Sequence, residues 1–376
     1  MKKIISIILC FVLTATFAIA QDTAKIRQSI DKAAAYLRST QSPSGAWVTP
    51  RTSIGPTTIV LTGLIDAGVP IDDPMVVGGL KFVLASTSEN GGIYTPDGFL
   101  QNYETCCAIM CLVKANAAFK KKDGSEPYKE LIAKADKFIR AHQHTEATNV
   151  QPDHPDYGGI GYGEMIKRPD MSNMQFFLDA LKAAGAKEDD PAIQKALVFV
   201  SRCQNLETEH NKMPFLAQQT AEGLDGGFIY YNQPDPEGTK ATEGLRSYGG
   251  MTYAGLKSMI YAGLTKEDKR VQAALGWIAK NYSVKENPGR GAAGLYYYYQ
   301  TMAKAFEVQK LAIFEDSSGK KHHWRADLSE QLIAVQQANG SWINAESSQY
   351  MENDPNLVTG YVLLALALCM PDKEHP

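Results

Sequence analysis

The side chains best suited to chemistry are tyrosines that stand at the starts of apolar segments. Tyr248 and Tyr253 flank the start of one such segment, and Tyr296–Tyr299 open another. Aromatic faces can hold a cation or stack on a sugar ring. Four consecutive tyrosines on a helix point in four directions, so we expect one or two of these four to face a ligand.

Acidic and basic side chains lie close to the same segment starts. Glu104 and Asp170 precede or open apolar segments and are candidate acids, although each can instead serve the helix dipole. Arg246 and Arg290 lie in the loops before the tyrosine-rich segments, where an arginine can receive a phosphate or carboxylate or simply be solvated. The sequence therefore predicts catalytic roles for Glu104, Asp170, Tyr248 and Tyr297, and ligand-binding roles for Tyr253, Tyr298, Arg246 and Arg290.

No residue pattern indicates a metal or cofactor site. Cys106, Cys107 and Cys111 fall within one apolar segment, where a helix would not let them converge on one metal, and buried cysteines commonly pack as small hydrophobes. The histidines show no metal-ligand spacing. We therefore predict no metal and no cofactor.

A repeated glycine turn organises the elements that must position these residues. Gln41, Gly45 and Trp47 recur with the same spacing at Gln336, Gly340 and Trp342. Weaker copies of the turn have glycines at positions 91, 158, 226 and 291. Glycine adopts a positive φ without a Cβ penalty, and a tryptophan two residues later can cover the end of the preceding helix. Six copies indicate a repeat architecture.

An amphipathic helix is expected before most of these turns. Apolar residues recur at helical spacing in five copies, and three copies begin with an acidic cap, as in Asp73-Pro74 and Asp190-Pro191. An aspartate followed by proline is typical of a helix N-cap with proline at the first helical position.

A second, more apolar helix is expected after each turn, and its low charge indicates burial on most of its circumference. Paired with the amphipathic helices, these segments predict an all-α fold, an (α/α)6 toroid of six outer-inner helical hairpins, because no single hairpin buries its own apolar stripe. The predicted inner helices are Thr57–Ala67, Glu104–Ala118, Ser172–Ala184, Gly250–Ala262, Leu295–Val308 and Val358–Leu368.

Two long insertions, His142–Asp156 and Gln204–Asp225, separate outer helices from the inner helices that follow them. In a toroid these insertions lie on the rim around the N-termini of the inner helices. Loops gathered around one mouth of a rigid scaffold commonly carry function. We therefore expect the working site at this mouth.

The glutamine, glycine and tryptophan signature, together with six helical hairpins, resembles the prenyltransferase and squalene oxidase repeat superfamily. This superfamily includes squalene-hopene cyclases and the β subunits of protein prenyltransferases. The resemblance covers roughly residues 25–370 and implies a terpenoid cyclase/prenyltransferase-like toroid around a central cavity for an isoprenoid-like ligand. The repeat motif is specific for the fold and not for the reaction.

The reactive motifs of that superfamily are missing. The Asp-x-Asp-Asp acid of alkene-protonating cyclases does not occur, and the string before Tyr296–Tyr299 lacks the histidine of a prenyltransferase zinc site. Three functions therefore stay open. The chain is an enzyme acting on an apolar, isoprenoid-like substrate, a noncatalytic binding or interaction protein on the same toroid, or, less favoured, a carbohydrate-active enzyme.

The N-terminus has the pattern of a cleavable signal peptide. Lys2 and Lys3 precede an apolar run that ends in Ala18-Ile19-Ala20, which predicts a signal at residues 1–20 and one domain at 21–376. Export to the periplasm or the medium follows. Cleavage takes the formal net charge from −3 to −5, which leaves no basic footprint for nucleic acid. No later stretch is apolar enough to predict a transmembrane segment, so the expected partners are a small apolar molecule and, alternatively, another protein.

Overall fold

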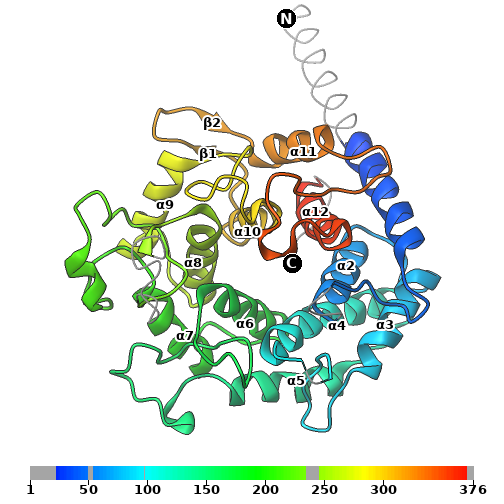
Figure 1. The fold of residues 1–376 in the computed structure, drawn as a ribbon, viewed down its shortest axis with the longest axis horizontal. Helices are drawn as coiled ribbons and strands as arrows, with labels where there is room; N and C mark the ends of the chain where they lie inside the picture. Colours follow the sequence, from blue (N-terminus) through cyan, green and yellow to red (C-terminus); the bar gives the residue numbers. More distant parts are fainter. Residues whose placement is uncertain (1–22, 50–53, 97, 234–244, 371–376) are drawn as a thin grey trace, which may run out of the picture.

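The fold is an all-α toroid built from two concentric rings of helices (Figure 1). A computed structural model describes residues 23–49, 54–96, 98–233 and 245–370, so the predicted signal peptide at 1–20 lies outside the described residues. Inner helices pack against one another in chain order, and the last of them, α12, packs against the first, α2, which closes the ring. The predicted architecture is confirmed.

The outer ring consists of a helix at residues 23–40, α3 Pro74–Ala85, α5 Lys129–Ala141, α7 Pro191–Arg202, α9 Lys269–Asn281 and α11 Trp324–Ala334. The inner ring consists of α2 Ile54–Asp66, α4 Gln101–Asp123, α6 Met171–Ala183, α8 Gly249–Tyr261, α10 Leu295–Val308 and α12 Pro355–Cys369. Each inner helix therefore begins within three residues of the start expected from its apolar composition.

Three outer helices begin at the aspartates that the sequence marks as caps. The carboxylates of Asp73, Asp190 and Asp268 accept hydrogen bonds from the backbone N–H groups of Met75, Ala192 and Arg270, respectively. Proline follows the cap in α3 and α7, where its missing N–H is not needed. Asp73 therefore caps α3, as its repeated pattern suggests.

The repeated glutamines bridge neighbouring hairpins. Gln204 Nε2 donates 2.9 Å to the carbonyl of Gly226 in its own turn and 2.8 Å to the carbonyl of Arg270 in the next outer helix. Gln41 and Gln143 make the same pair of bonds, and Gln336 bonds back to Ser29, which joins the sixth hairpin to the first. The four glutamines thus join neighbouring hairpins at four of the six seams of the ring, in addition to bonding the helix ends that their position suggests.

Glycine is required at these seams because the turn touches the next helix. Gly158 has φ +82°, and a Cβ there would lie 1.9 Å from the carbonyl oxygen of Lys195 in α7. The two tryptophans cap the outer helices, since Nε1 of Trp47 and Nε1 of Trp342 donate to Leu37 and Leu332 at distances of 2.9 and 2.7 Å. Both tryptophans are buried, and each covers the end of an outer helix, as predicted.

Outside the two rings of helices, the described residues form little other regular structure. Within the described ranges the sheet structure is a two-stranded antiparallel hairpin, β1 Phe314–Glu315 and β2 Lys321–His322, beside α9 and α11 (Figure 1). Short 3-10 helices lie at η1 Glu146–Thr148, η2 Pro214–Gln218 and η4 Gln349–Met351. No helix in the described part of the chain combines the length and apolar character that crossing a membrane demands.

Candidate functional site

A central cavity of about 540 Å³ lies where the six inner helices begin. Every inner helix contributes a side chain from its first two turns: Pro56, Tyr103, Ser172 and Phe176, Met251, Tyr297, and Leu357 and Tyr361. The remaining lining side chains come from the loops that lead into these helices. A volume of this size and an apolar wall are typical of small-molecule sites.

An aromatic belt runs around the inside of the cavity. The ring of Phe176 lies edge-on to Tyr103 at 5.1 Å and 6.2 Å from Tyr297, and Tyr297 lies edge-on to Tyr361 at 6.1 Å. Tyr103 and Tyr361 both line the cavity, so the four rings share its wall. The four rings come from four different inner helices, so the toroid itself brings them together.

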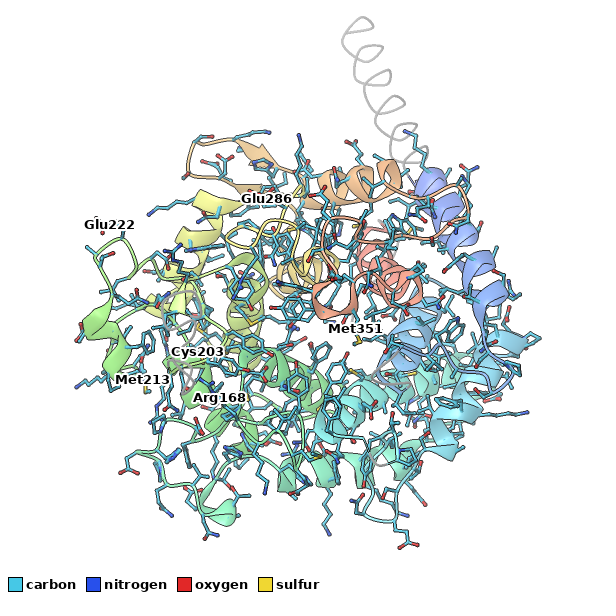
Figure 2. The ribbon with its side chains drawn as sticks, viewed as in Figure 1. Arg168, Cys203, Met213, Glu222, Glu286 and Met351 are labelled. Atoms are coloured by element: carbon cyan, nitrogen blue, oxygen red, sulfur yellow. The ribbon has the colours of Figure 1, made fainter. Side chains whose placement is uncertain are left out.

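A loop with unusual backbone geometry contributes to the lining of the cavity. Tyr350 and Met351 both have positive φ, at 58° and 61°, and both line the cavity. Figure 2 shows Met351 near the middle of the ring. Such conformations cost energy in non-glycine residues and are often found at functional sites.

Glu352 holds this loop in place from a fully buried position. Its Oε1 accepts hydrogen bonds from the backbone N–H groups of Tyr296 and Tyr297 at 2.9 and 2.8 Å, and Oε2 accepts from Asn344 Nδ2 at 2.7 Å. Gly294 gives α10 no side-chain cap, so Glu352 satisfies the start of this helix instead. Burial raises the pKa of Glu352, while these bonds oppose the rise.

Three of the eight predicted site residues lie on the cavity wall. Tyr248 and Tyr297 line it, and the guanidinium of Arg290 lies 4.7 Å above the Tyr248 ring at the mouth. Of Tyr296–Tyr299, Tyr297 is the member that reaches the cavity. Burial raises the pKa of Tyr248 and of Tyr297, so both phenols stay protonated.

The predicted acids lie behind the wall. Glu104 is buried, and its carboxylate accepts bonds from the N–H and hydroxyl of Thr95 at 2.7 and 2.8 Å. Asp170 caps α6 through the N–H of Asn173, and burial raises its pKa to about 6. Burial and then the nearby Asp170 carboxylate raise the pKa of Tyr230, which lines the cavity. The link from Asp170 to the cavity is therefore indirect.

The other predicted binding residues lie away from the cavity. Tyr253 is buried between helices, with its ring edge-on to Tyr298 at 5.6 Å and to Phe306 at 5.3 Å. The hydroxyl of Tyr298 donates 2.7 Å to the carbonyl of Ser283, and Arg246 is exposed outside the cavity. These two tyrosines pack inner helices together.

The rim loops that line the cavity differ from those that the insertions suggested. Described lining residues come from segments close to the inner helices, such as Phe99, Tyr162, Tyr230 and Tyr231, and none comes from residues 142–156 or 204–225. The insertions fold outside these segments. Tyr162 and Tyr230 were not predicted, although each follows a glycine of the repeated turn, Gly158 or Gly226, by four residues.

The three clustered cysteines lie buried in α4, as their apolar context suggested. Burial raises the pKa of Cys111 to about 12 and raises the pKa of Cys106 as well, so their thiols stay protonated. Across residues 23–370, apart from the stretches left undescribed, no three histidine, cysteine or acidic side chains are grouped to hold a metal ion.

No protein-family model and no curated protein matches the sequence. Among solved structures, a protein from Actinoplanes is 13% identical, with 92% of this chain and 99% of that chain covered at a TM-score of 0.50. The type II terpene cyclase MstE from Scytonema is similar at lower scores. A structure of MstE with its substrate geranylgeranyl dihydroxybenzoate is 15% identical, covers 94% of this chain and 99% of that chain, and has a TM-score of 0.38. The structure without ligand is 14% identical, covers 93% of this chain and 99% of that chain, and has a TM-score of 0.37. At these identities the Actinoplanes match supports a shared fold and nothing about the reaction.

Proposed function

We propose that this chain binds one apolar, isoprenoid-like small molecule in the central cavity, on a toroid of the terpenoid cyclase and prenyltransferase type. The main support is the composition of the cavity wall. Arg290 is the only charged side chain among the described residues that line a cavity otherwise built from aromatic, aliphatic and neutral polar groups. Burying apolar ligand surface there contributes roughly 25 cal/mol per Å².

The ligand enters through the mouth at the inner-helix N-termini, and its polar end stays near Arg290. Within the described residues the Arg290 guanidinium has a ring contact with Tyr248 but no ion pair or hydrogen bond. Stacking holds the guanidinium plane and leaves its N–H groups available to a carboxylate, phosphate or other oxygen. Arg246, on the exposed approach, contributes long-range attraction only.

A purely binding role and an enzymatic role differ in what Asp170 does. As an enzyme, the chain would use Asp170 as the acid, with Tyr230 between its carboxyl and the ligand. No described lining residue is an aspartate or glutamate, which disfavours the paired carboxylates of carbohydrate-active enzymes. This favours binding as the first function, with catalysis on an isoprenoid-like substrate as the second.

Export of the protein is part of this proposal. Lys2, Lys3 and the apolar run before Ala20 support a signal peptide and a periplasmic or secreted protein. The working form is then the mature chain from residue 21, and the ligand is a molecule present outside the cytosol.

Mass spectrometry of small molecules extracted from the purified protein tests the proposal. An apolar molecule near one equivalent per chain is expected, and Tyr248→Ala and Tyr297→Ala should each weaken its rebinding by roughly 1–3 kcal/mol. Tyr128→Ala is the matched control, because Tyr128 packs on Phe119 outside the cavity. Circular dichroism establishes that each variant is folded. Unchanged affinity in both folded cavity variants contradicts the proposal.

A further inference from the structure

A buried charged pair lies directly behind the cavity wall. Lys257 of α8 is fully buried, and its Nζ lies 2.5 Å from Asp179 Oδ2 and donates 2.9 Å to Gln175 Oε1. Tyr261 donates its hydroxyl to the other Asp179 oxygen at 2.9 Å. Gln175 in turn contacts the hydroxyl of Tyr297. The proposed ligand-binding function does not use this pair.

The lysine fixes the orientation of the Gln175 side chain. An ammonium group donates hydrogen bonds and accepts none, so the Gln175 carbonyl oxygen must face Lys257. The amide nitrogen of Gln175 then faces Tyr297 and donates to its hydroxyl oxygen. The Tyr297 oxygen therefore accepts a hydrogen bond from behind the wall, and its own hydrogen must point elsewhere.

The hydroxyl groups of Ser172 and Tyr297 together have one more hydrogen than the bond between them uses. Ser172 Oγ lies 3.0 Å from the Tyr297 hydroxyl oxygen, and the two groups own one hydrogen each. Only one hydrogen can lie between the two oxygens. The other, from whichever residue, has no acceptor among the described residues. Ser172 and Tyr297 both line the cavity, so this hydrogen is available to a ligand.

The neighbouring tyrosine pair in the cavity behaves differently. The hydroxyls of Tyr162 and Tyr230 lie 3.2 Å apart. Burial and then the nearby Asp170 carboxylate raise the pKa of Tyr230, so this carboxylate is an acceptor beside the pair. The second hydroxyl hydrogen of that pair therefore has a carboxylate acceptor close by within the protein. The two pairs differ in their third partner. Tyr297 has the Gln175 amide, a donor that Lys257 orients, whereas Tyr230 has the Asp170 carboxylate, an acceptor.

We propose that the cavity selects an oxygenated apolar ligand, whose alcohol, carbonyl or ether oxygen accepts the free hydrogen of the Ser172–Tyr297 pair. This inference rests on the proposed function, since it specifies the class of molecule that the same cavity takes. Lys257 is a positioning residue, because it acts through Gln175 and does not touch the ligand.

Equilibrium dialysis with two C15 probes, the alcohol farnesol and the hydrocarbon farnesene, tests the inference. The measured quantity is the selectivity ratio, the Kd of farnesene divided by the Kd of farnesol. We expect the ratio of the parent protein to exceed that of a Ser172→Ala/Tyr297→Phe double variant by about tenfold. Ser172→Ala alone should keep the parent ratio, because the Tyr297 hydrogen is then free. Tyr162→Phe, the matched control, should also keep it.

The positioning role has its own test in two opposed substitutions. Lys257→Met lets the Gln175 amide turn and accept from Tyr297, so the selectivity ratio should fall to that of the double variant although both hydroxyls remain. Gln175→Leu removes the amide and leaves the hydrogen free, so the ratio should stay at the parent value. If the network had a purely structural role, the selectivity ratios of Lys257→Met and Gln175→Leu would change in the same way.

The outcomes separate this inference from the proposed function. Equal selectivity ratios in the parent and the double variant overturn the inference while leaving ligand binding intact. Failure of the parent to bind either probe overturns both proposals. If Lys257→Met does not fold, the double variant, which retains the buried ion pair, still decides the question.

Discussion

Asp170→Asn should make the protein more stable at neutral pH, although it removes a helix-capping carboxylate. Burial raises the pKa of Asp170 to about 6 from an ordinary value near 3.8. A group whose pKa is raised on folding contributes stability below its unfolded pKa and loses that contribution as pH rises through the folded value. At 1.36 kcal/mol per pKa unit, the buried charge costs about 3 kcal/mol above pH 6.

An amide at this position avoids the charge and keeps the cap. Its carbonyl oxygen can still accept from the Asn173 N–H, now 2.8 Å from the Asp170 carboxylate. The new NH2 group needs an acceptor, and Asn173 Oδ1, buried and unpaired within the described structure, supplies one if the Asn173 amide rotates. We therefore expect a net gain of about 1–3 kcal/mol at pH 8, shrinking to nearly zero by pH 4.

Urea denaturation followed by circular dichroism between pH 4 and pH 8 measures this difference. Asp190→Asn is the matched control with the opposite sign, because the Arg140 guanidinium lowers the pKa of that N-cap carboxylate. Its removal should destabilise the protein at neutral pH, by an amount that fades as pH falls. Parallel pH profiles for the parent and Asp170→Asn would refute the burial argument.

Three further outcomes follow from the seams, the thiols and the N-terminus. Gln204→Leu removes two buried hydrogen bonds and should lower the unfolding free energy, measured by urea denaturation, by about 2 kcal/mol. In the same assay, Gln272→Leu at an exposed position should change the unfolding free energy by less than about 0.5 kcal/mol. Cys106 and Cys111 should resist alkylation in the native protein and react only after unfolding, and rapid native labelling seen by mass spectrometry contradicts their burial. Intact-mass analysis of protein exported from a bacterial host should show cleavage after Ala20, and an uncleaved chain contradicts the signal-peptide prediction.

The ring could be predicted from the sequence because each hairpin repeats the same local chemistry. Glycine at a positive-φ turn, as at Gly158, and aspartate at a helix start, as at Asp190, are short-range requirements that a sequence displays directly. The Gln204 bond to the next outer helix could not be predicted, since its partner, Arg270, is 66 residues away in the sequence.

The site was less predictable because facing the cavity depends on helix rotation. Tyr297 and Tyr298 are adjacent in an apolar segment, yet one lines the cavity and the other packs against a loop carbonyl. Lys257 did leave a signal, as the one charged residue within α8, whereas Asp179 shares α6 with Lys182. Their pairing across α8 and α6 needs the three-dimensional ring to become apparent.

Photoaffinity labelling with a diazirine derivative of farnesol tests the central claim most directly, because it reports where an apolar molecule rests. Peptide mapping should place the label on the starts of the inner helices, at residues such as Tyr103, Phe176 and Tyr297, and excess farnesol should suppress it. Label confined to the outer helices, or label that excess farnesol does not suppress, would contradict a ligand site in the central cavity.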